Sequence, residues 1–231
     1  MALECAARRA MIEWWARGLF AGHCWACGGR LALGDDGPWC GGCAVAVQRA
    51  PTEPRPMGDL PVHCLWTYAG AVAPALANAK ASGHWPALSA ISRDWRALVT
   101  SAAPPGPLTL VAVPPHAGRL RERGWHLPDL LAAAVGRGRV WRPLARADAA
   151  LPRRLDRAQP PRFTWCARAG GGPHGAAVVI IDDVVTTGTT LAAVRALLRD
   201  RGVPVAAAVC LADARPDAVE QAAALAALQC G

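Results

Sequence analysis

Short apolar runs alternate along the chain with stretches in which apolar residues recur every three or four positions. The first pattern predicts buried strands, and the second predicts helices that pack through one face. Strands that alternate with helices favour an α/β domain built on a parallel sheet. The predicted strands are residues 62–68, 108–113, 176–181 and 203–211, and the predicted helices are residues 2–17, 72–81, 127–135, 189–201 and 217–228.

Proline and glycine divide the chain into three predicted parts. Residues 51–61 contain four prolines and one glycine, so this stretch is expected to be a linker without regular structure. Residues 1–50 hold the predicted N-terminal helix and a cysteine-rich segment, and residues 62–231 hold the α/β domain. The total of 231 residues fits one sizeable domain with a small appendage.

Four cysteines in the N-terminal part have the spacing of a zinc site. Two C-x-x-C pairs are separated by twelve residues, and four thiolates at such a spacing can close tetrahedrally around one zinc ion. Because four cysteine ligands leave no open position for a substrate, the zinc is expected to be structural. Two redox pairs, or unconnected thiols, are the alternatives. The predicted ligands are Cys24, Cys27, Cys40 and Cys43.

A strand that runs into acids and hydroxyls carries the predicted ligand site. Residues 178–190 read V-V-I-I-D-D-V-V-T-T-G-T-T. Open α/β sheets bind ligands at the carboxyl ends of their strands, and the free amides at the start of a helix attract phosphate. Gly188 allows close backbone approach, and Asp182 and Asp183 suit the hydroxyls of a ribose. Together these residues describe a pocket for a ribose 5-phosphate, and a helix cap with incidental acids is the alternative.

This thirteen-residue segment resembles the phosphoribosyl-pyrophosphate (PRPP) binding motif of type I phosphoribosyltransferases. Residues 20–211 as a whole resemble the ComF family, relatives of competence proteins that join an N-terminal four-cysteine zinc element to such a domain. Besides the cysteine pairs, the resemblance rests on Tyr68-Ala-Gly70 with a helix to Lys80, and on the block V-P-P-H-A-G-R-L-R-E-R-G-W-H at residues 113–126.

The resemblance implies a type I phosphoribosyltransferase-like parallel sheet flanked by helices, with a small zinc-ribbon element before it. It also implies that PRPP binds together with Mg²⁺. Asp182 and Asp183 would be the catalytic pair, which orients the ribose and stabilises the positive charge that develops as pyrophosphate leaves. The resemblance implies PRPP contacts for Asp182, Asp183, Val185, Thr186, Thr187, Gly188, Thr189, Thr190, Lys80, His116 and Arg119.

The chain departs from the family pattern at several positions. Purine-salvage relatives have an aspartate where this chain has Thr186, which disfavours 6-oxopurines as acceptors. His126 stands where the family has asparagine, and its imidazole is either a general acid or base or a structural group. The mobile-loop segment of relatives survives only in fragments. Candidates for contacts to this loop or to nucleic acid are Arg121, Arg123, His126, Arg153 and Arg157.

The formal net charge of +8 is concentrated in one segment. Residues 116–170 contain twelve arginines and four acids, whereas the charges of the remaining chain cancel. Trp125, Trp141 and Trp165 lie in the same segment. The segment is therefore either a surface that binds single-stranded DNA or an arginine-rich loop whose positive charge only balances the negative charge of PRPP.

Neither a membrane-spanning helix nor a signal peptide is expected from the sequence. No run of about 20 uncharged apolar residues occurs, and charged residues interrupt the N-terminal segment. We therefore expect a cytoplasmic protein without membrane insertion.

Three functions from different classes remain open at this point. The first is a PRPP-binding protein of ComF type that acts in DNA uptake and natural transformation, with single-stranded DNA and competence proteins as partners. The second is a magnesium-dependent phosphoribosyltransferase that acts on an unidentified nucleobase or amine. The third is a non-catalytic zinc-ribbon module that binds nucleic acid. An intact acidic pair and phosphate loop weigh against the third.

Overall fold

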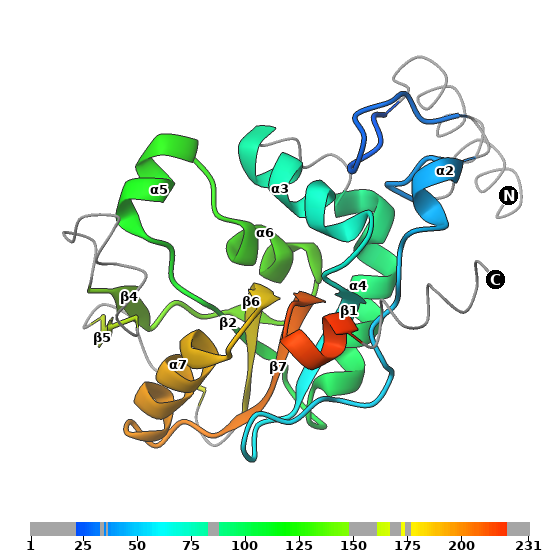
Figure 1. The fold of residues 1–231 in the computed structure, drawn as a ribbon. Coiled ribbons are helices and arrows are strands. Elements are labelled where there is room, and N and C mark those ends of the chain that lie inside the picture. The colour runs from blue at the N-terminus through cyan, green and yellow to red at the C-terminus, as the bar shows by residue number, and fades with distance from the viewer. Residues whose placement is uncertain are drawn as a thin grey trace, which may run out of the picture. The chain divides into compact units, whose positions relative to one another are not determined.

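The computed structural model of the chain describes residues 22–32, 35, 37–82, 88–147, 161–166, 172–173 and 177–220 (Figure 1). The chain divides into two compact units, of which one comprises residues 1–47 and 70–91 and the other residues 48–69 and 92–231. The predicted helix over residues 2–17 lies outside the described residues. Of the predicted helix over residues 217–228, only the part up to residue 220 is described, and it is helical.

The larger unit contains a five-stranded sheet in which every pair of neighbouring strands is parallel. The strand order is β1-β7-β6-β2-β3 (Figure 1). This sheet, together with the helices on its faces, confirms the predicted α/β fold class. The strands are β1 Val62–Thr67, β2 Thr109–Ala112, β3 Arg139–Val140, β6 Val178–Val185 and β7 Val205–Asp213.

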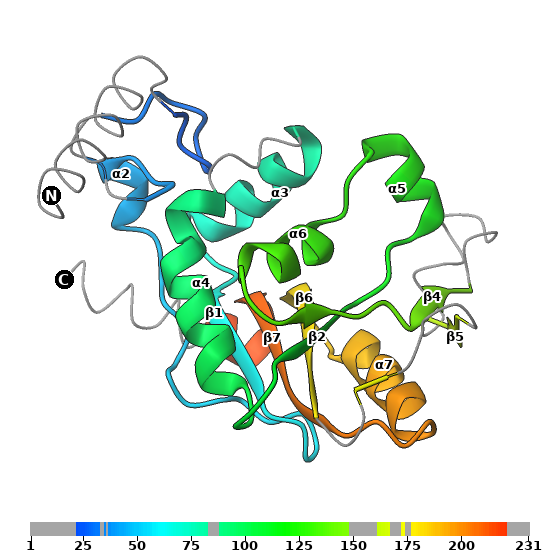
Figure 2. The same cartoon turned by 180° about the vertical axis from the view of Figure 1, so that it is seen from behind.

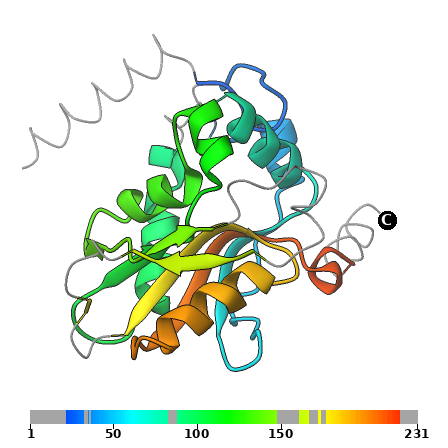
Figure 3. The same cartoon turned by 90° about the vertical axis from the view of Figure 1, so that its left-hand side faces the viewer.

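Helices cover both faces of this sheet. Helix α7, Thr189–Arg199, lies on one face, and α6, Leu127–Ala134, lies with α4, Leu88–Ala102, on the other (Figures 2 and 3). The indole Nε1 of Trp95 in α4 donates a 2.8 Å hydrogen bond to the carbonyl of Leu131 in α6. Connections that run in opposite directions across the sheet place their helices on opposite faces, because parallel crossovers are right-handed.

The strand order reverses between the two neighbouring strands β2 and β6. From β2 the chain continues outward to β3, and from β6 it continues outward in the other direction to β7. Open α/β sheets bind ligands outside the carboxyl ends of their strands at such a switch point. The fold therefore brings the segments that follow β2 and β6 to the same place on the sheet edge.

Strand β6 lies at the centre of the hydrophobic core. Residues 178–181 are fully buried, as expected for a strand that has a neighbour on either side and helices on both faces. The strand continues four residues beyond its predicted end at residue 181. It does so because β7 pairs with it from Asp182, opposite Cys210, to Val185, opposite Asp213. Acidic residues have low strand propensity, so the sequence pattern places the end of the strand too early.

Most predicted elements agree with the structure to within a few residues. Outside the cysteine-rich segment, which contains an unpredicted one-turn helix, five described elements were not predicted. One is α4, whose apolar residues Trp95 and Val99 recur at helical spacing and are completely buried. A second is the short helix α5, Ala117–Arg123, which ends at Gly124 in the left-handed conformation. The others are β3 and the antiparallel pair of β4, Leu144–Arg146, with β5, Phe163–Trp165. Strands of two or three residues are too short to give a periodic signal.

The smaller unit contains the cysteine pairs, the one-turn helix α2, Gly41–Ala44, and helix α3, Val72–Ser82. The side-chain amide of Asn78 in α3 donates hydrogen bonds to the carbonyls of Trp25, at 3.2 Å, and Ala26, at 2.9 Å. These bonds attach the loop of the first cysteine pair to α3. Among the described residues, no helix has the length and apolar character needed to cross a membrane.

Candidate phosphoribosyl site

The two acids that follow the buried part of β6 differ in exposure. Asp182 is 8% exposed, and its Oδ1 accepts a 2.8 Å hydrogen bond from the backbone N–H of Asp183. Asp183 is half-buried. Because successive side chains of a strand point to opposite faces, the two carboxylates emerge on opposite faces of the sheet, near its carboxyl edge.

The loop between β6 and α7 turns through a left-handed glycine directly before the helix begins. Gly188 adopts a φ of 77° and forms the N-terminal cap of α7. Thr186, Thr187 and Thr189 are exposed around it. The hydroxyls of Thr187 and Thr189 are 2.7 Å apart, and the backbone N–H of Thr189 donates to the Thr187 hydroxyl at 3.4 Å. Backbone amides, hydroxyls and the positive end of the α7 dipole therefore converge on this turn.

The segment after β2 reaches the same edge of the sheet. The backbone N–H of Val113 donates a 2.9 Å hydrogen bond to the carbonyl of Ile181. The continuation of β2 therefore runs beside β6 as far as the residue before Asp182. His116 caps α5, because its Nδ1 accepts a 3.2 Å hydrogen bond from the backbone N–H of Gly118. Arg119 lies in the first turn of α5 and is exposed. The His116–Arg119 segment therefore begins three residues beyond the point where the chain pairs with β6, and its contact with PRPP stays a prediction.

Three further candidates for loop or nucleic-acid contacts lie on or just after α5, of which two are exposed arginines and one is a histidine paired with an aspartate. Arg121 and Arg123 are exposed in the last turn of α5, and the Arg123 guanidinium lies 5.8 Å from the centre of the Trp125 ring. His126 Nδ1 lies 3.0 Å from Asp129 Oδ2, and the other carboxylate oxygen of Asp129 accepts a 2.8 Å hydrogen bond from Arg142.

The environment of Asp129 favours its ionised form. Partial burial raises the pKa of Asp129, but the hydrogen bond with His126 and the charge of Arg142 outweigh it, so the pKa lies below its usual value. An ionised Asp129 favours an Nδ1–H on His126. This pairing supports the structural alternative for His126.

Three predicted contacts are not placed at the switch point by the described residues. Lys80 lies in the last turn of α3, in the smaller unit, so its part in the site stays a prediction. Arg153 and Arg157 lie outside the described residues. The predictions for these three side chains rest on the sequence alone.

Asp213 is a functional candidate that the sequence analysis missed. It ends β7 beside Val185, is 1% exposed, and accepts hydrogen bonds from Arg215 Nε at 2.9 Å and Nη2 at 2.7 Å. Arg55 Nη1 donates to it at 3.2 Å. A signal was present, because Asp213 follows an apolar strand just as Asp182 does. The strand was predicted to end at residue 211, so Asp213 was not recognised as its last residue.

The tryptophans of the basic segment are partly structural. Trp141 is 2% exposed, and its ring packs edge-to-face on that of Trp165 at a centroid distance of 5.5 Å. The Arg201 guanidinium lies 4.9 Å from the centre of the Trp165 ring. Trp141 is therefore a core residue, and of the three tryptophans it is the least able to stack on a base.

The four predicted zinc ligands form one cluster in the smaller unit. The Sγ atoms of Cys24, Cys27, Cys40 and Cys43 all lie within 4.8 Å of one another, and those of Cys27 and Cys40 are 3.8 Å apart. A tetrahedral zinc ion with Zn–S bonds of about 2.3 Å needs sulfurs about 3.8 Å apart. The donor set and its spacing fit a structural zinc ion, which these four thiolates would hold without an open position.

The cluster also favours thiolate formation at one cysteine. Burial raises the pKa of Cys24, but backbone hydrogen bonds from Cys27, Cys40 and Ala26 outweigh it and lower the pKa to about 7. Hydrogen bonds from Cys40 and Cys24 raise the pKa of Cys43 to about 12. The sulfurs are close enough to share protons, which a bound cation would displace.

Comparisons with known proteins gave one family model and similar solved structures. Residues 151–225 match the family model described as the phosphoribosyl transferase domain. Among solved structures, the chain is similar to a hypoxanthine phosphoribosyltransferase from Staphylococcus aureus, with a TM-score of 0.36 and 18% identity over 58% of this chain and 66% of that one, slightly under two thirds of its length. No curated protein sequence matches significantly. The segment that matches the family model contains β6, the loop at residues 186–188 and α7.

Proposed function

We propose that the chain binds PRPP together with Mg²⁺ at residues 182–190. The observation that carries the proposal is the sequence of groups along β6, its loop and α7. A buried acid and a half-buried acid lie in the second half of the strand, and a left-handed glycine then opens a helix among exposed threonines. The turn suits the 5-phosphate of PRPP, and the carboxylates suit its ribose hydroxyls.

The pyrophosphate end of PRPP needs a second binding segment, and the loop after β2 is the candidate. PRPP carries a pyrophosphate on C1 of the ribose, and the His116–Arg119 segment follows β2, which is the neighbour of β6 in the sheet. Arg119 is exposed there, and an arginine guanidinium donates in the planar geometry that phosphate oxygens accept. Mg²⁺, when bound with PRPP, would neutralise charge on the departing pyrophosphate.

The chemistry that this arrangement supports is phosphoribosyl transfer. A nitrogen of the acceptor forms a bond to C1 of the ribose, and the bond from C1 to the pyrophosphate oxygen breaks, so that pyrophosphate leaves with the electron pair. The ribosyl group is positively charged in between, and fixed carboxylates at Asp182 and Asp183 stabilise it without reorganising. Because Thr186 offers a hydroxyl in place of a carboxylate, we expect an acceptor that needs no strong base at this position.

Calorimetry tests the binding step. We expect PRPP with Mg²⁺ to release heat on the wild-type protein, and Asp183→Ala to abolish or strongly reduce it. Asp200→Ala is the matched control, because Asp200 is an exposed carboxylate at the far end of α7 and should bind PRPP as the wild type does. Equal heats for wild type and Asp183→Ala would sink the proposal.

We further propose that the protein is of ComF type and acts in the cytoplasm in uptake of single-stranded DNA. A four-cysteine cluster and a phosphoribosyl transferase segment in one chain support the family, and exposed Arg119, Arg121 and Arg123 beside Trp125 support contacts to nucleic acid. A pyrophosphate-release assay over a panel of bases and amines, with and without single-stranded DNA, separates the two roles. Release with one acceptor and no response to DNA would favour a plain transferase.

A further inference from the structure

A hairpin before β1 packs against the loop at residues 186–188 between β6 and α7, which we call the phosphate loop. The backbone groups of Met57 and Leu60 bond to each other in both directions, at 2.8 and 3.2 Å, and Arg55 N–H donates to the carbonyl of Val62 at 2.9 Å. Gly58, with a φ of 62°, occupies the first central position of the two-residue turn, where type II′ hairpins need glycine. We call residues 55–60 the positioning hairpin. They lie within the stretch that the sequence presents as a linker.

Met57 of the positioning hairpin lies directly against the Gly188 turn. A Cβ placed on Gly188 would stand 1.8 Å from Met57 Sδ and 3.1 Å from Met57 Cγ. Gly188 itself is buried, and Met57 is partly buried against the core that contains Leu191 and Val194 of α7. The thioether therefore fills the space that the missing side chain of Gly188 leaves, on the buried side of the turn.

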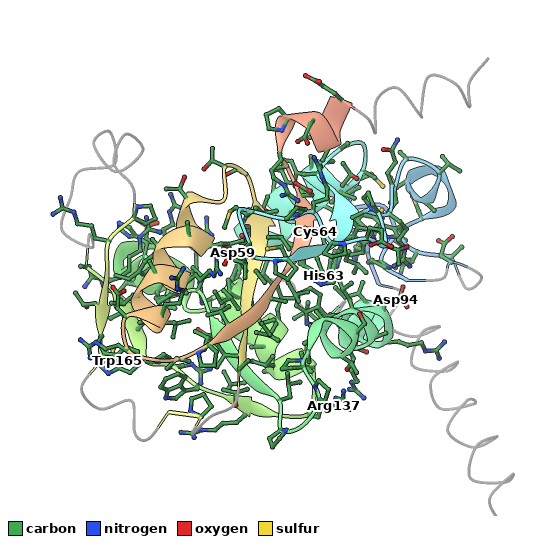
Figure 4. All side chains as sticks on the ribbon, turned by 90° about the horizontal axis from the view of Figure 1, so that it is seen from below. Asp59, His63, Cys64, Asp94, Arg137 and Trp165 are labelled. Carbon is green, nitrogen blue, oxygen red and sulfur yellow. The ribbon has the colours of Figure 1, made fainter. Side chains whose placement is uncertain are left out.

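Two sets of ion pairs attach the same hairpin to the elements around the loop. Asp59, which is labelled in Figure 4, accepts two hydrogen bonds from Arg195 in α7. The bond between Arg195 Nη2 and Asp59 Oδ2 is 2.6 Å long. Arg55 pairs with Asp213 at 3.2 Å and also with Asp217. The hairpin is thus fixed both to the helix that opens at the phosphate loop and to the end of β7.

We propose that the positioning hairpin holds the phosphate loop in its ligand-binding conformation, with Met57 and Gly188 as a matched pair. The proposal rests on the proposed function, since it assigns Met57 as a positioning residue for PRPP binding. A turn through a left-handed glycine has other conformations of similar energy, because glycine lacks the steric limits of other residues. Met57 packs against one of them. Preorganising a loop in this way raises affinity by removing the entropic cost of ordering it on binding.

A double-mutant cycle tests the contact without any ligand. Gly188→Ala introduces both a strained φ and a clash with Met57, whereas in a Met57→Ala background only the strain remains. We expect Gly188→Ala to lower the Tm by about 5 °C more in the wild-type background than in the Met57→Ala background. Equal losses in both backgrounds would show that the Met57 contact does not constrain the turn, and would overturn the proposal.

PRPP affinity tests the positioning role. Met57→Ala should weaken PRPP binding about tenfold, whereas Met57→Leu, which restores the apolar volume, should remain within about threefold of wild type. Leu197→Ala is the matched control, because Leu197 packs against the same core two turns further along α7 and should leave PRPP affinity unchanged.

The outcomes distinguish a failure of the positioning role of the hairpin from a failure of the proposed PRPP binding. Wild-type affinity in Met57→Ala overturns the positioning role while PRPP binding stands. An equal loss of affinity in Leu197→Ala shows a general effect of core stability and also overturns it. If the wild type binds no PRPP, the proposed function fails and the ligand role of the hairpin fails with it, while the ligand-free cycle still decides whether Met57 constrains the turn.

Discussion

Gly188 is a residue for which two independent requirements exclude any side chain. Its φ of 77° lies in the left-handed region, which costs other residues roughly 1 kcal/mol, and the position of its absent Cβ is occupied by Met57 Sδ. The sequence reveals the first requirement, because a glycine between a strand and a helix indicates a tight turn. It does not reveal the second, because the partner lies more than a hundred residues earlier in the chain.

At the residue scale, the Asp59–Arg195 pair predicts an acid-dependent loss of stability. The hydrogen bonds from Arg195 lower the pKa of Asp59 from 3.8 to about 2. Because this pKa is depressed in the folded state, the pair contributes stability above pH 3.8 and loses it as the pH falls through about 2. In urea unfolding between pH 5 and pH 2, the stability difference between wild type and Asp59→Asn should shrink toward low pH. A constant difference over that range would contradict the pairing.

The buried indole of Trp95 makes a second prediction at this scale. Its ring is 0% exposed, and its N–H is bonded to the carbonyl of Leu131. Trp95→Phe should destabilise the fold by about 1–3 kcal/mol, because it leaves a carbonyl without its donor and opens space in the core. Trp125→Phe, at a half-buried site, should cost less than about 1 kcal/mol. Urea unfolding measures both, and equal costs would count against the special position of Trp95.

Individual residues of the site differ in how well sequence reasoning placed them. Asp182 and Asp183 could be placed directly after a buried apolar run, and Gly188 directly before a helix, because the pattern of residue types is local. Asp213 was missed because the predicted strand ended two residues before it, and Met57 could not be placed because its partner Gly188 is distant in sequence. The sequence contains no local pattern for such contacts.

At the element scale, the strands were easier to predict than some of the helices. Residues 178–181 of β6 form a continuous, fully buried apolar run, which is a distinctive signal. Helix α4 has apolar residues four positions apart, but polar and charged residues between them, and it was not predicted. Helix α5 shows almost no apolar periodicity, because arginine and glutamate fill it, and it is defined by its caps at His116 and Gly124.

The cysteine cluster is expected to bind zinc and to hold the surrounding loop region in its folded conformation. One zinc ion per chain should be bound in a folded sample, and its removal by a chelator should expose the amides of residues 22–46 to hydrogen exchange, because the four thiolates are the main cross-link of this loop region. Cys40→Ser should bind less zinc and show the same exposure without chelator. Less than about half an equivalent of zinc in a folded sample would contradict a structural site.

At the scale of the whole molecule, the order of the strands decides where the site lies. The sequence predicts alternating strands and helices, but it does not say which strands are neighbours. The order β1-β7-β6-β2-β3 brings the loops after β2 and β6 together, although about seventy residues separate them in the chain. Topology therefore makes neighbours of β2, which leads to the arginine-bearing segment, and β6, which holds the acids, and only the family resemblance anticipated this.

The central claim is that PRPP binds at the turn between β6 and α7, and amide hydrogen exchange tests it most directly. Addition of PRPP with Mg²⁺ should slow exchange at residues 186–190 in the wild type, because the phosphate accepts hydrogen bonds from these amides. The same addition should leave residues 24–43 unchanged. Unchanged exchange at residues 186–190 at a saturating concentration of PRPP, or protection confined to other segments, would contradict the claim.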